Sequence, residues 1–559
     1  MKDSYLKPKL FSTIKHYSGK QFTSDLIAGI IVAIIALPLS IALAIASGVE
    51  PAQGVYTAIF AGFTVSLLGG SRVQIAGPTA AFATVVASIV ATQGMSGLII
   101  ATVIAGIFLI LMGIFKLGSL IKFIPYTITT GFTAGIAVTI FIGQIKDFLG
   151  LSYASGVKPI ETIEKISANI EAIGTFSWQA FVVGAVSLAI LIIYPKFEKR
   201  VPPSLIAVII GACMVKFIPA LDSGVNTIGE LYIIPSGFPP FALGNLDFSL
   251  AKISAVLPDA LTIAILAAIE SLLSCVVADS MVNSHHNPNA ELVAQGVGNI
   301  ASVMFGGIPA TGAIARTAAN AKNGGKTPVA GMVHAVVLLL VLLFFMPYAG
   351  LIPMPTIAAI LFMVAYNMSE HKKFTRVIKT APKSDIAVML STFLLTVIFD
   401  LVIAIEVGLV LTAILFIKRL TEQTNITGWK YIDSATDKDN IDLKSVPKSV
   451  RVYEISGPLF FGVADKILDI ELRDYTRCLV LRMRAVPSLD ATAMNQLEVL
   501  LEKCKNAGVT LVMSHVNSQP LETMKKAGFY DKVGEINFCE HIDSALERAE
   551  AVVSQSQAV

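Results

Sequence analysis

Apolar residues form long runs from about residue 25 to about residue 419. The runs have the length of membrane-spanning helices, or of broken versions of them, and polar turn residues separate them. We expect about fourteen spans, near 24–46, 52–69, 77–93, 97–117, 119–147, 176–195, 203–220, 254–278, 290–306, 312–321, 327–348, 352–368, 384–400 and 402–418. The pattern therefore predicts an α-helical polytopic membrane protein.

After residue 419 the pattern becomes that of a small α/β domain, in which short apolar strands alternate with amphipathic helices. The expected elements are strands over 450–456, 478–483 and 509–515, and helices over 464–472, 491–506, 520–527 and 542–551. We expect these domains: a cytoplasmic N-terminal segment (1–22), a transmembrane domain (23–420), a linker (421–447), the α/β domain (448–551) and a frayed tail (552–559).

Composition excludes several classes of protein. Of 559 residues, 54% are hydrophobic and 14% are charged, which is not the composition of a soluble enzyme. A net charge of +3 gives no reason to expect nucleic acid as a partner. The five scattered cysteines lack a CxxC pair, and the His285-His286 pair has no further ligands at metal spacing. We expect no disulfide framework, metal site or cofactor.

Basic residues gather at the termini and in alternate loops, so both termini are expected on the cytoplasmic side of the membrane. The basic residues that set this orientation are Lys2, Lys7, Lys9, Lys15, Lys20, Lys116, the run 196–200, Lys372, Lys373, Arg376, Lys379, Lys383, Lys418 and Arg419.

The chain contains an internal repeat. The letters AQGV occur at 52–55 and again at 294–297, and each copy opens an apolar span that ends in a Gly-Gly pair. A proline-interrupted segment and a short helix follow each pair. If each half holds seven spans, the second half enters the membrane from the opposite side, and the two short helices direct their N-termini toward each other near the midplane.

The second broken segment, residues 306–320, carries Arg316. An arginine at bilayer depth costs about 3 kcal/mol or more unless something satisfies it. The N-terminus of the short helix also attracts anions, because its backbone N–H groups have no partner within the helix. We therefore expect an anion to bind at Arg316.

With these features, the chain resembles the SulP family of anion transporters, the bacterial relatives of solute carrier family 26. Its C-terminal domain resembles a STAS domain. The residues that carry the resemblance are Pro38, 54–56 (GVY), 71–79 (SRVQIAGPT), 269–273 (IESLL), 291–300 (ELVAQGVGNI) and 324–327 (GGKT). Residues 36–45 (ALPLSIALAI) and 367–370 (NMSE) resemble the bacterial subgroup that takes up C4-dicarboxylates.

The resemblance implies two inverted seven-span repeats, a core domain that moves like an elevator against a gate domain, and a homodimer. It implies substrate contacts at two half-helix starts, which in this sequence are Thr79, Ala80 and Ala81, and Ala315 and Arg316. Relatives carry a glutamine and an aromatic where this chain has Leu39 and Leu43. This departure favours a larger, partly apolar anion over chloride or bicarbonate.

Glu270 lies in the middle of the eighth span, where an ionisable residue is functional by default, and Ser274 lies one turn later on the same face. The resemblance implies that this position couples transport to a cation. The carboxyl can carry a proton, or Glu270 and Ser274 can belong to a sodium site. Relatives that use sodium have aspartate here, which favours the proton. A structural alternative is that Glu270 pairs with Arg316.

Other polar residues have structural explanations. Asp25 and Asp279 lie near cytoplasmic span ends. His334 is expected to be an interior histidine whose ring nitrogens have hydrogen-bond partners, with a proton relay as the alternative. In the STAS-like domain, Ala491 stands where soluble relatives carry a phosphorylatable serine, although Ser488 and Thr492 lie nearby. A folding and dimer-supporting module and a regulatory module both remain open for this domain.

The sequence therefore predicts a secondary active transporter of small anions, such as sulfate, a C4-dicarboxylate or bicarbonate, coupled to protons and embedded in the lipid bilayer. It is not expected to be an enzyme. One alternative is a sodium-coupled symporter of bicarbonate or another anion. Another is an anion channel or sensor that signals through the STAS domain.

Overall fold

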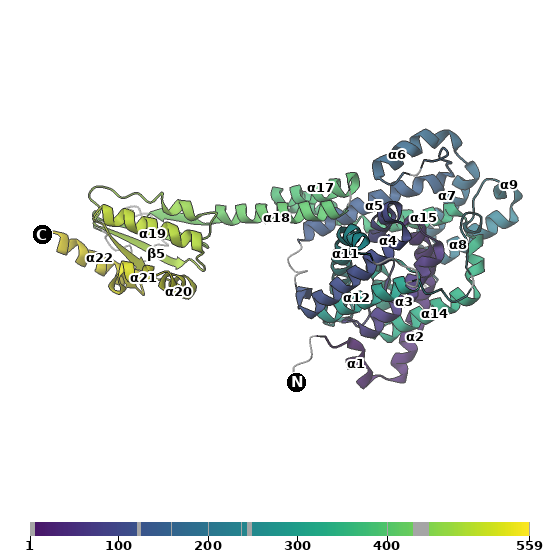
Figure 1. The fold of residues 1–559 in the computed structure, drawn as a ribbon, viewed down its shortest axis with the longest axis horizontal. Helices are drawn as coiled ribbons and strands as arrows, with labels where there is room; N and C mark the ends of the chain where they lie inside the picture. Colours follow the sequence, from purple (N-terminus) through teal and green to yellow (C-terminus); the bar gives the residue numbers. More distant parts are fainter. Residues whose placement is uncertain are drawn as a thin grey trace. The chain divides into compact units, whose positions relative to one another are not determined.

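The computed structural model describes residues 6–119, 125–157, 159–198, 201–235, 237–242, 249–399, 401–428 and 447–557. The chain forms two compact units, Met1–Leu409 and Val410–Val559 (Figure 1). Lys2, Lys199 and Arg200 and most of the predicted linker lie outside the described residues.

The first unit is helical. Its main helices are α1 (Lys9–Thr13), α2 (Gly19–Ala46), α3 (Pro51–Leu68), α4 (Ala80–Ile114), α5 (Tyr126–Leu149), α6 (Thr162–Glu171), α7 (Trp178–Ile193), α8 (Pro203–Phe217), α11 (Leu250–Val282), α12 (Pro288–Met304), α13 (Ile314–Lys322), α14 (Val329–Phe344), α15 (Met354–Met368), α16 (His371–Thr380) and α17 (Lys383–Ile398). The last helix, α18 (Leu401–Gln423), begins in this unit and continues into the second.

Six helices in the described residues are long and apolar enough to cross a membrane. Two more predicted spans correspond to shorter apolar helices, α8 and α14, and the others to helices that do not meet this criterion of length and apolarity. The predicted spans 77–93 and 97–117 form one helix, α4, which is interrupted at Gly94 by non-helical backbone with φ 71° and ψ 179°. Counting α4 as two segments, the fourteen predicted spans all have a helical counterpart, so the expectation of a polytopic helical fold is confirmed.

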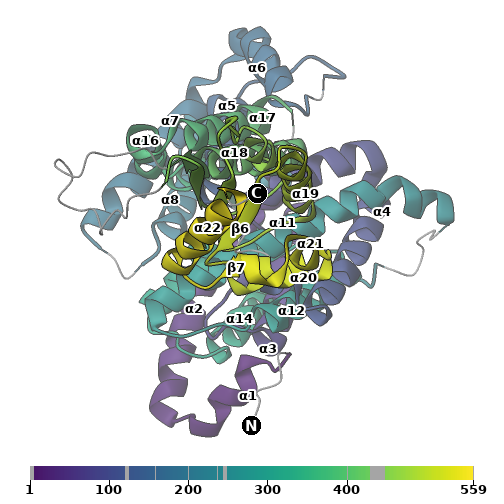
Figure 2. The same ribbon diagram turned by 90° about the vertical axis from the view of Figure 1, so that its left-hand side faces the viewer.

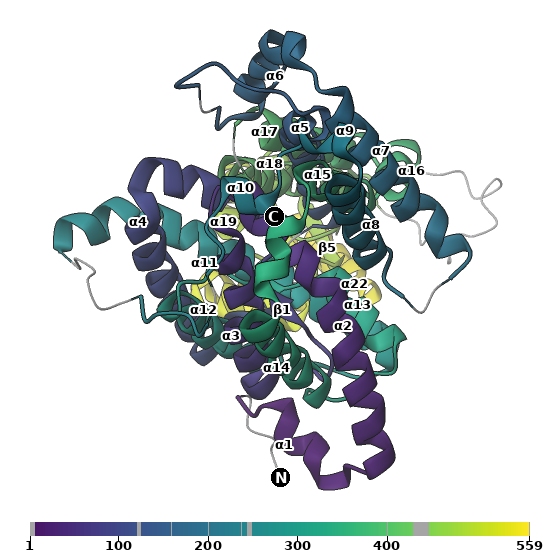
Figure 3. The ribbon, with the colours of Figure 1, turned by 90° about the vertical axis from the view of Figure 1, so that its right-hand side faces the viewer.

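The helices of the first unit gather into two bundles. One, the core bundle, contains α2, α3, α4, α11, α12, α13 and α14; the other, the gate bundle, contains α5, α7, α8, α15 and α17 (Figure 3). Figures 2 and 3 both show α4 and α11 running side by side out of the core bundle.

Packing contacts in the two bundles come in matching pairs. In the core bundle, α4 packs against α11 and α12, and its counterpart α14 packs against α2 and α3. In the gate bundle, α5 packs against α17, and α7 packs against α15. A two-fold relation between the two halves of the chain requires this pairing. The pairs therefore agree with two inverted seven-segment repeats.

The second unit is an α/β domain with a five-stranded sheet in the order β3-β4-β5-β6-β7. Strands β4 (Val450–Ser456), β5 (Cys478–Ala485), β6 (Thr510–Ser514) and β7 (Phe538–Cys539) are parallel, and β3 (Asn425–Gly428) joins antiparallel to β4. The helices are α19 (Ala491–Asn506), α20 (Ser518–Lys526), α21 (Phe529–Val533) and α22 (Ile542–Gln557).

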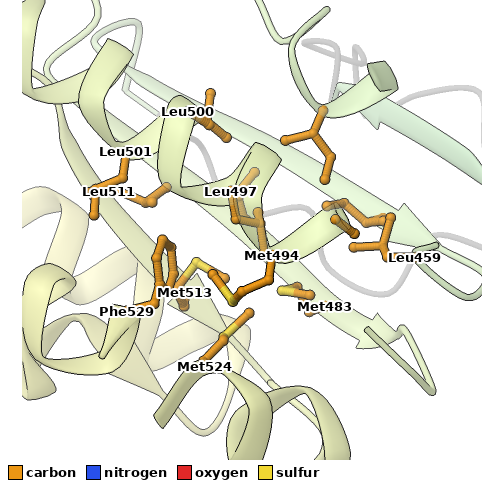
Figure 4. Packing of buried hydrophobic residues seen from close by; sticks show 14 of the residues in the cluster. Leu459, Met483, Met494, Leu497, Leu500, Leu501, Leu511, Met513, Met524 and Phe529 are labelled. Atoms are coloured by element: carbon orange, nitrogen blue, oxygen red, sulfur yellow. The ribbon is translucent and has the colours of Figure 1, made fainter. Parts of the chain in front are cut away.

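The side chains of the strands alternate between two separate apolar layers, one on each face of the sheet. In β5, Leu479 and Leu481 join the cluster that also contains Leu497 of α19, and Figure 4 shows part of this cluster. Cys478 and Val480 pack instead with residues of α22. Successive side chains of a strand point to opposite faces, so a strand between two helical layers is apolar throughout.

Three local expectations for this unit are wrong. The predicted helix over 464–472 is one short 3₁₀ turn, Ala464–Ile467. Residues 425–428, predicted as linker, form the edge strand β3, because their backbone groups pair with β4. The predicted frayed tail is helical as far as Gln557, since α22 continues past residue 551 and Val553 remains buried against the sheet.

Candidate functional site

The two proline- and glycine-broken segments meet inside the core bundle. Residues Ala76–Gly77 (β1) pair antiparallel with Thr311–Gly312 (β2), so that Ala76 faces Gly312 and Gly77 faces Thr311. Helix α4 begins just after the first segment and α13 just after the second. Because the two segments run antiparallel, the short helices leave the crossing in opposite directions, with their N-termini toward it.

Hydrogen bonds between the two halves of the chain fix this crossing. The backbone N–H of Ala313 donates to the carbonyl of Ile75 at 2.9 Å. The backbone N–H of Ile75 donates in turn to the hydroxyl of Thr317 at 3.0 Å. The backbone N–H of Gly312 donates to the hydroxyl of Ser271 in α11, also at 3.0 Å. Each broken segment is thus held by partners from the other half or from α11.

Arg316 reaches across the crossing. Its guanidinium donates through Nη2 to the carbonyl of Pro78, directly before the start of α4. The residue is 1% exposed, and its Nε and Nη1 groups have no hydrogen-bond partner within the described part of the chain. Gly77 allows this approach, because a Cβ there would collide with the guanidinium. Two unpartnered donors of a fixed positive charge therefore lie beside the N-terminus of α4.

The other predicted substrate contacts lie around the same crossing. Thr79 is the N-cap of α4, and Ala80 and Ala81 form its first buried turn. The side-chain hydroxyl of Thr79 does not cap α4, which leaves the first N–H groups of the helix without a side-chain cap. Ala315, in the first turn of α13, has an exposed side chain.

Glu270, on α11, contacts the first half of the chain. Its carboxylate accepts a hydrogen bond from the hydroxyl of Thr79 at 2.7 Å, and the residue is 9% exposed. Arg316 makes no hydrogen bond to Glu270, because Nη2 donates to a backbone carbonyl and the other two nitrogens have no partner among the described residues. The two opposite charges still attract each other within the core bundle. Ser274 does not share this contact; its hydroxyl donates to Thr317 at 3.3 Å.

The two leucines on α2 lie apart from polar groups. Leu43 is buried in the core bundle. Leu39 is half-buried and packs against an apolar cluster of the gate bundle that includes Phe148 of α5 and Ala358 of α15. Leu39 therefore lies where the two bundles meet.

Sequence reasoning missed a buried polar network behind the crossing. The carboxylate of Glu291 accepts from the backbone N–H of Gly70 at 2.9 Å and from the side-chain amides of Gln74 and Gln295, each at 3.0 Å. Asn299 continues the network, because its amide exchanges hydrogen bonds with the backbone of Ala310. All four side chains belong to motifs used for the family resemblance, so the motif match was the available signal.

The carboxylates near helix ends have structural roles, as expected. Asp25 accepts hydrogen bonds from the hydroxyl of Thr327 at 2.6 Å and from the backbone N–H of Lys326 at 2.9 Å. Asp279 lies 2.7 Å from Nδ1 of His286. No group of His, Cys, Asp and Glu that could hold a metal ion occurs among the described residues.

His334 differs from the expectation of a satisfied interior histidine. It is fully buried on α14, and neither ring nitrogen has a hydrogen-bond partner among the described residues. Its ring lies beside Gly62 of α3, next to the carbonyl of Ala76 in the crossing. A second unpartnered polar side chain is thus present one layer behind the site.

Comparison with known proteins supplies the family context. The Sulfate permease family matches residues 22–392, and the STAS domain matches residues 441–545. The chain is 42% identical over 539 residues to the putative sulfate transporter YvdB of Bacillus subtilis, across 95% of this chain and 98% of that protein. It is 31% identical over 536 residues to the bicarbonate transporter BicA of Picosynechococcus sp., across 92% of each chain.

The fold also matches a solved structure. The murine Solute Carrier 26 family member A9 anion transporter, in the inward-facing state, gives a TM-score of 0.87 at 17% identity, over 98% of this chain and 94% of that one. At this identity the match shows the likeness of fold alone.

Proposed function

This chain belongs to the sulfate permease family, and from that premise we propose that it is a proton-coupled secondary active transporter of small anions. The observation that carries the proposal is Arg316, whose buried Nε and Nη1 have no hydrogen-bond partner among the described residues and lie where two helix N-termini converge. Charge-assisted hydrogen bonds to a carboxylate, a sulfate or a bicarbonate would satisfy both donors. The proposed substrate contacts are Thr79, Ala80, Ala81, Ala315 and Arg316.

The proposed substrates are sulfate and C4-dicarboxylates, with bicarbonate as a further candidate. Relatives of this chain bear the names of sulfate and bicarbonate transporters, which supports the first and third. The apolar side chains of Leu39 and Leu43 on α2 support an anion with a carbon skeleton, because they offer apolar surface and no hydrogen-bond donor.

Proton coupling is proposed to act through Glu270, together with Ser274 on the same helix. The carboxylate accepts one hydrogen bond, from the Thr79 N-cap of α4, so gain or loss of its proton changes an interaction at the binding site itself. The hydroxyl of Ser274 donates to Thr317 and makes no contact with Glu270 that the structure describes. The proton is preferred over sodium because relatives that use sodium have aspartate where this chain has Glu270.

Movement is proposed to follow an elevator mechanism in a homodimer. The core bundle carries the whole crossing and moves as a body, and the gate bundle holds its place in a bacterial inner membrane with both chain termini in the cytoplasm. Residues 23–420 form the proposed transport domain, 421–447 the linker and 448–551 the STAS domain. The chemistry proposed is binding and release, without an enzymatic step.

Reconstitution tests this function. Purified protein in liposomes is given labelled sulfate, bicarbonate, fumarate or succinate, with proton and sodium gradients imposed separately, and Arg72→Ala is the matched control because Arg72 is exposed in the loop before the crossing. Accumulation driven by protons supports the proposal. Accumulation driven by sodium favours a sodium-coupled symporter, and dissipative flux or none favours a channel or sensor that acts through the STAS domain.

A further inference from the structure

The connection between α5 and α7 contains a short helix, α6, which packs on the side of α5. Its contacts to the protein are polar. The hydroxyl of Thr162 donates to that of Thr139 at 3.3 Å, and the side-chain amide of Asn169 donates to the carbonyl of Ile142 at 3.3 Å. The hydroxyl of Tyr153 donates to Asn169 at 2.9 Å. The side of α6 that faces the protein is therefore its polar, hydrogen-bonding side.

Large apolar side chains of α6 point away from the protein. Ile163, Ile166 and Ile170 are 52%, 40% and 67% exposed. At about 100° per residue these three positions fall within an arc of about 60°. Ile173, in the 3₁₀ turn Ala172–Thr175 that follows, extends the same arc and is also exposed. A water-soluble surface does not present a stripe of isoleucines in this way.

The third side of α6 is charged and polar. Glu164, Ser167 and Glu171 are exposed and fall on an arc that begins about 40° beyond Ile163. The helix thus divides into a side against the protein, an apolar side and an acidic side. Three sides of this kind fit a helix at a boundary where protein, hydrocarbon and water meet.

The apolar side of α6 continues into a membrane-facing surface. Phe176 follows the 3₁₀ turn and contacts Phe181 of α7, with ring centroids 6.0 Å apart. Helix α7 is an apolar candidate span in which only 28% of the residues of its most apolar window are buried, so many of its side chains are exposed or half-buried. It begins at Trp178, which is exposed, and tryptophan is typical of the membrane–water boundary.

We propose that α6 is an interfacial helix whose isoleucine side lies in the acyl chains of the bilayer and whose acidic side lies in water. The occupant of the exposed apolar side is lipid. A second copy of this chain fits less well, because a two-fold contact through this side would bring the flanking carboxylates of Glu164 and Glu171 near their copies. Because α6 packs on α5, it anchors the gate bundle at a fixed depth in the membrane. Under the proposed elevator mechanism, the core bundle needs such a fixed gate bundle to move against.

Nitroxide labels on single cysteines test the proposal in the full chain, reconstituted in vesicles of phosphatidylethanolamine and phosphatidylglycerol. The background is C213S with C539S, because Cys213 is exposed and Cys539 is partly so. Ile166→Cys and Ile170→Cys report on the apolar side. Ser167→Cys and Glu171→Cys are matched controls on the acidic side, since Glu164 caps the start of α6 through two backbone hydrogen bonds and is left unchanged. All four positions are exposed, so the label displaces no packed side chain.

We expect collisions with oxygen to dominate at 166 and 170, and collisions with a water-soluble nickel chelate to dominate at 167 and 171. Equal access of the chelate to all four positions would place the helix in water and overturn the proposal. A second result would also overturn the proposal: both reagents are excluded at 166 and 170, and the spectra show spin–spin broadening that disappears on dilution with unlabelled protein. This result would show that a second copy of the chain covers the isoleucine side. Neither outcome depends on transport, so the proposed function stands or fails separately.

Discussion

Arg316→Ala separates anion binding from folding. The substitution removes two buried donors, Nε and Nη1, that have no partner in the described protein. If each makes a charge-assisted hydrogen bond to the anion worth about 1.5–3 kcal/mol, binding weakens by about 3–6 kcal/mol. That loss corresponds to an increase in Kd of about 10²- to 10⁴-fold.

The fold should not weaken in the same way. Without a bound anion, Arg316 is a buried charge whose described hydrogen bond is to the Pro78 carbonyl, and its burial costs about 3 kcal/mol or more. The substitution removes this cost, but it also leaves a cavity and removes the attraction between Arg316 and Glu270. Because these effects oppose each other, we expect the anion-free variant to unfold at a temperature close to that of the parent protein.

Thermal unfolding with increasing sulfate, bicarbonate or fumarate measures both quantities. An anion at 100 times its Kd stabilises the parent protein by about 2.7 kcal/mol, and this stabilisation should disappear in Arg316→Ala. Arg72→Ala, which removes an exposed arginine from the loop between α3 and β1, should keep it. A Kd within about threefold of the parent value in Arg316→Ala, or equal losses in both variants, would refute the assignment of the site.

Three further predictions follow from particular contacts. Glu270→Gln keeps a hydrogen-bond acceptor but cannot exchange a proton, so we expect liposomes to retain anion counterflow and lose proton-driven accumulation; unchanged accumulation would disprove the coupling role. Gly312→Ala places a Cβ against the buried amide of Gln74 and should lower the free energy of unfolding by about 1–3 kcal/mol. The control is Gly19→Ala, whose added Cβ has no described atom within 4 Å, and this variant should be neutral in the same thermal assay. Leu497→Ala opens a cavity in the buried core of the second unit and should lower its free energy of unfolding by about 2–5 kcal/mol, measured with denaturant. Anion affinity should stay unchanged. A parallel loss of affinity would contradict the independence of the anion site from the core of the second unit.

Element type could be predicted from the sequence wherever the signal is local. Apolar length marks the spans, and the two broken segments are visible because Pro78 and Pro309 interrupt apolar runs. The helix Ala491–Asn506 was predicted to the residue, since Asp490 caps its start with a hydrogen bond to the backbone N–H of Ala493. By contrast, residues 464–472 have helix-forming composition but form only one 3₁₀ turn, because packing against the sheet outweighs propensity there.

The sequence by itself determined that an arginine lies in a broken segment of a membrane protein, and that a matching break exists in the other half. Only the tertiary structure decided that Gly77 faces Thr311, that Arg316 meets Pro78 and that Glu270 meets Thr79. It also decided that His334 is buried with no hydrogen-bond partner in the part of the chain that the structure describes, where the sequence favoured a hydrogen-bonded histidine. The physical reason is the sequence range over which each signal acts. Hydropathy and turn preference act within a few neighbours, whereas these contacts join residues about 190 to 240 positions apart. Nothing in the local sequence of either partner encodes the distance between them.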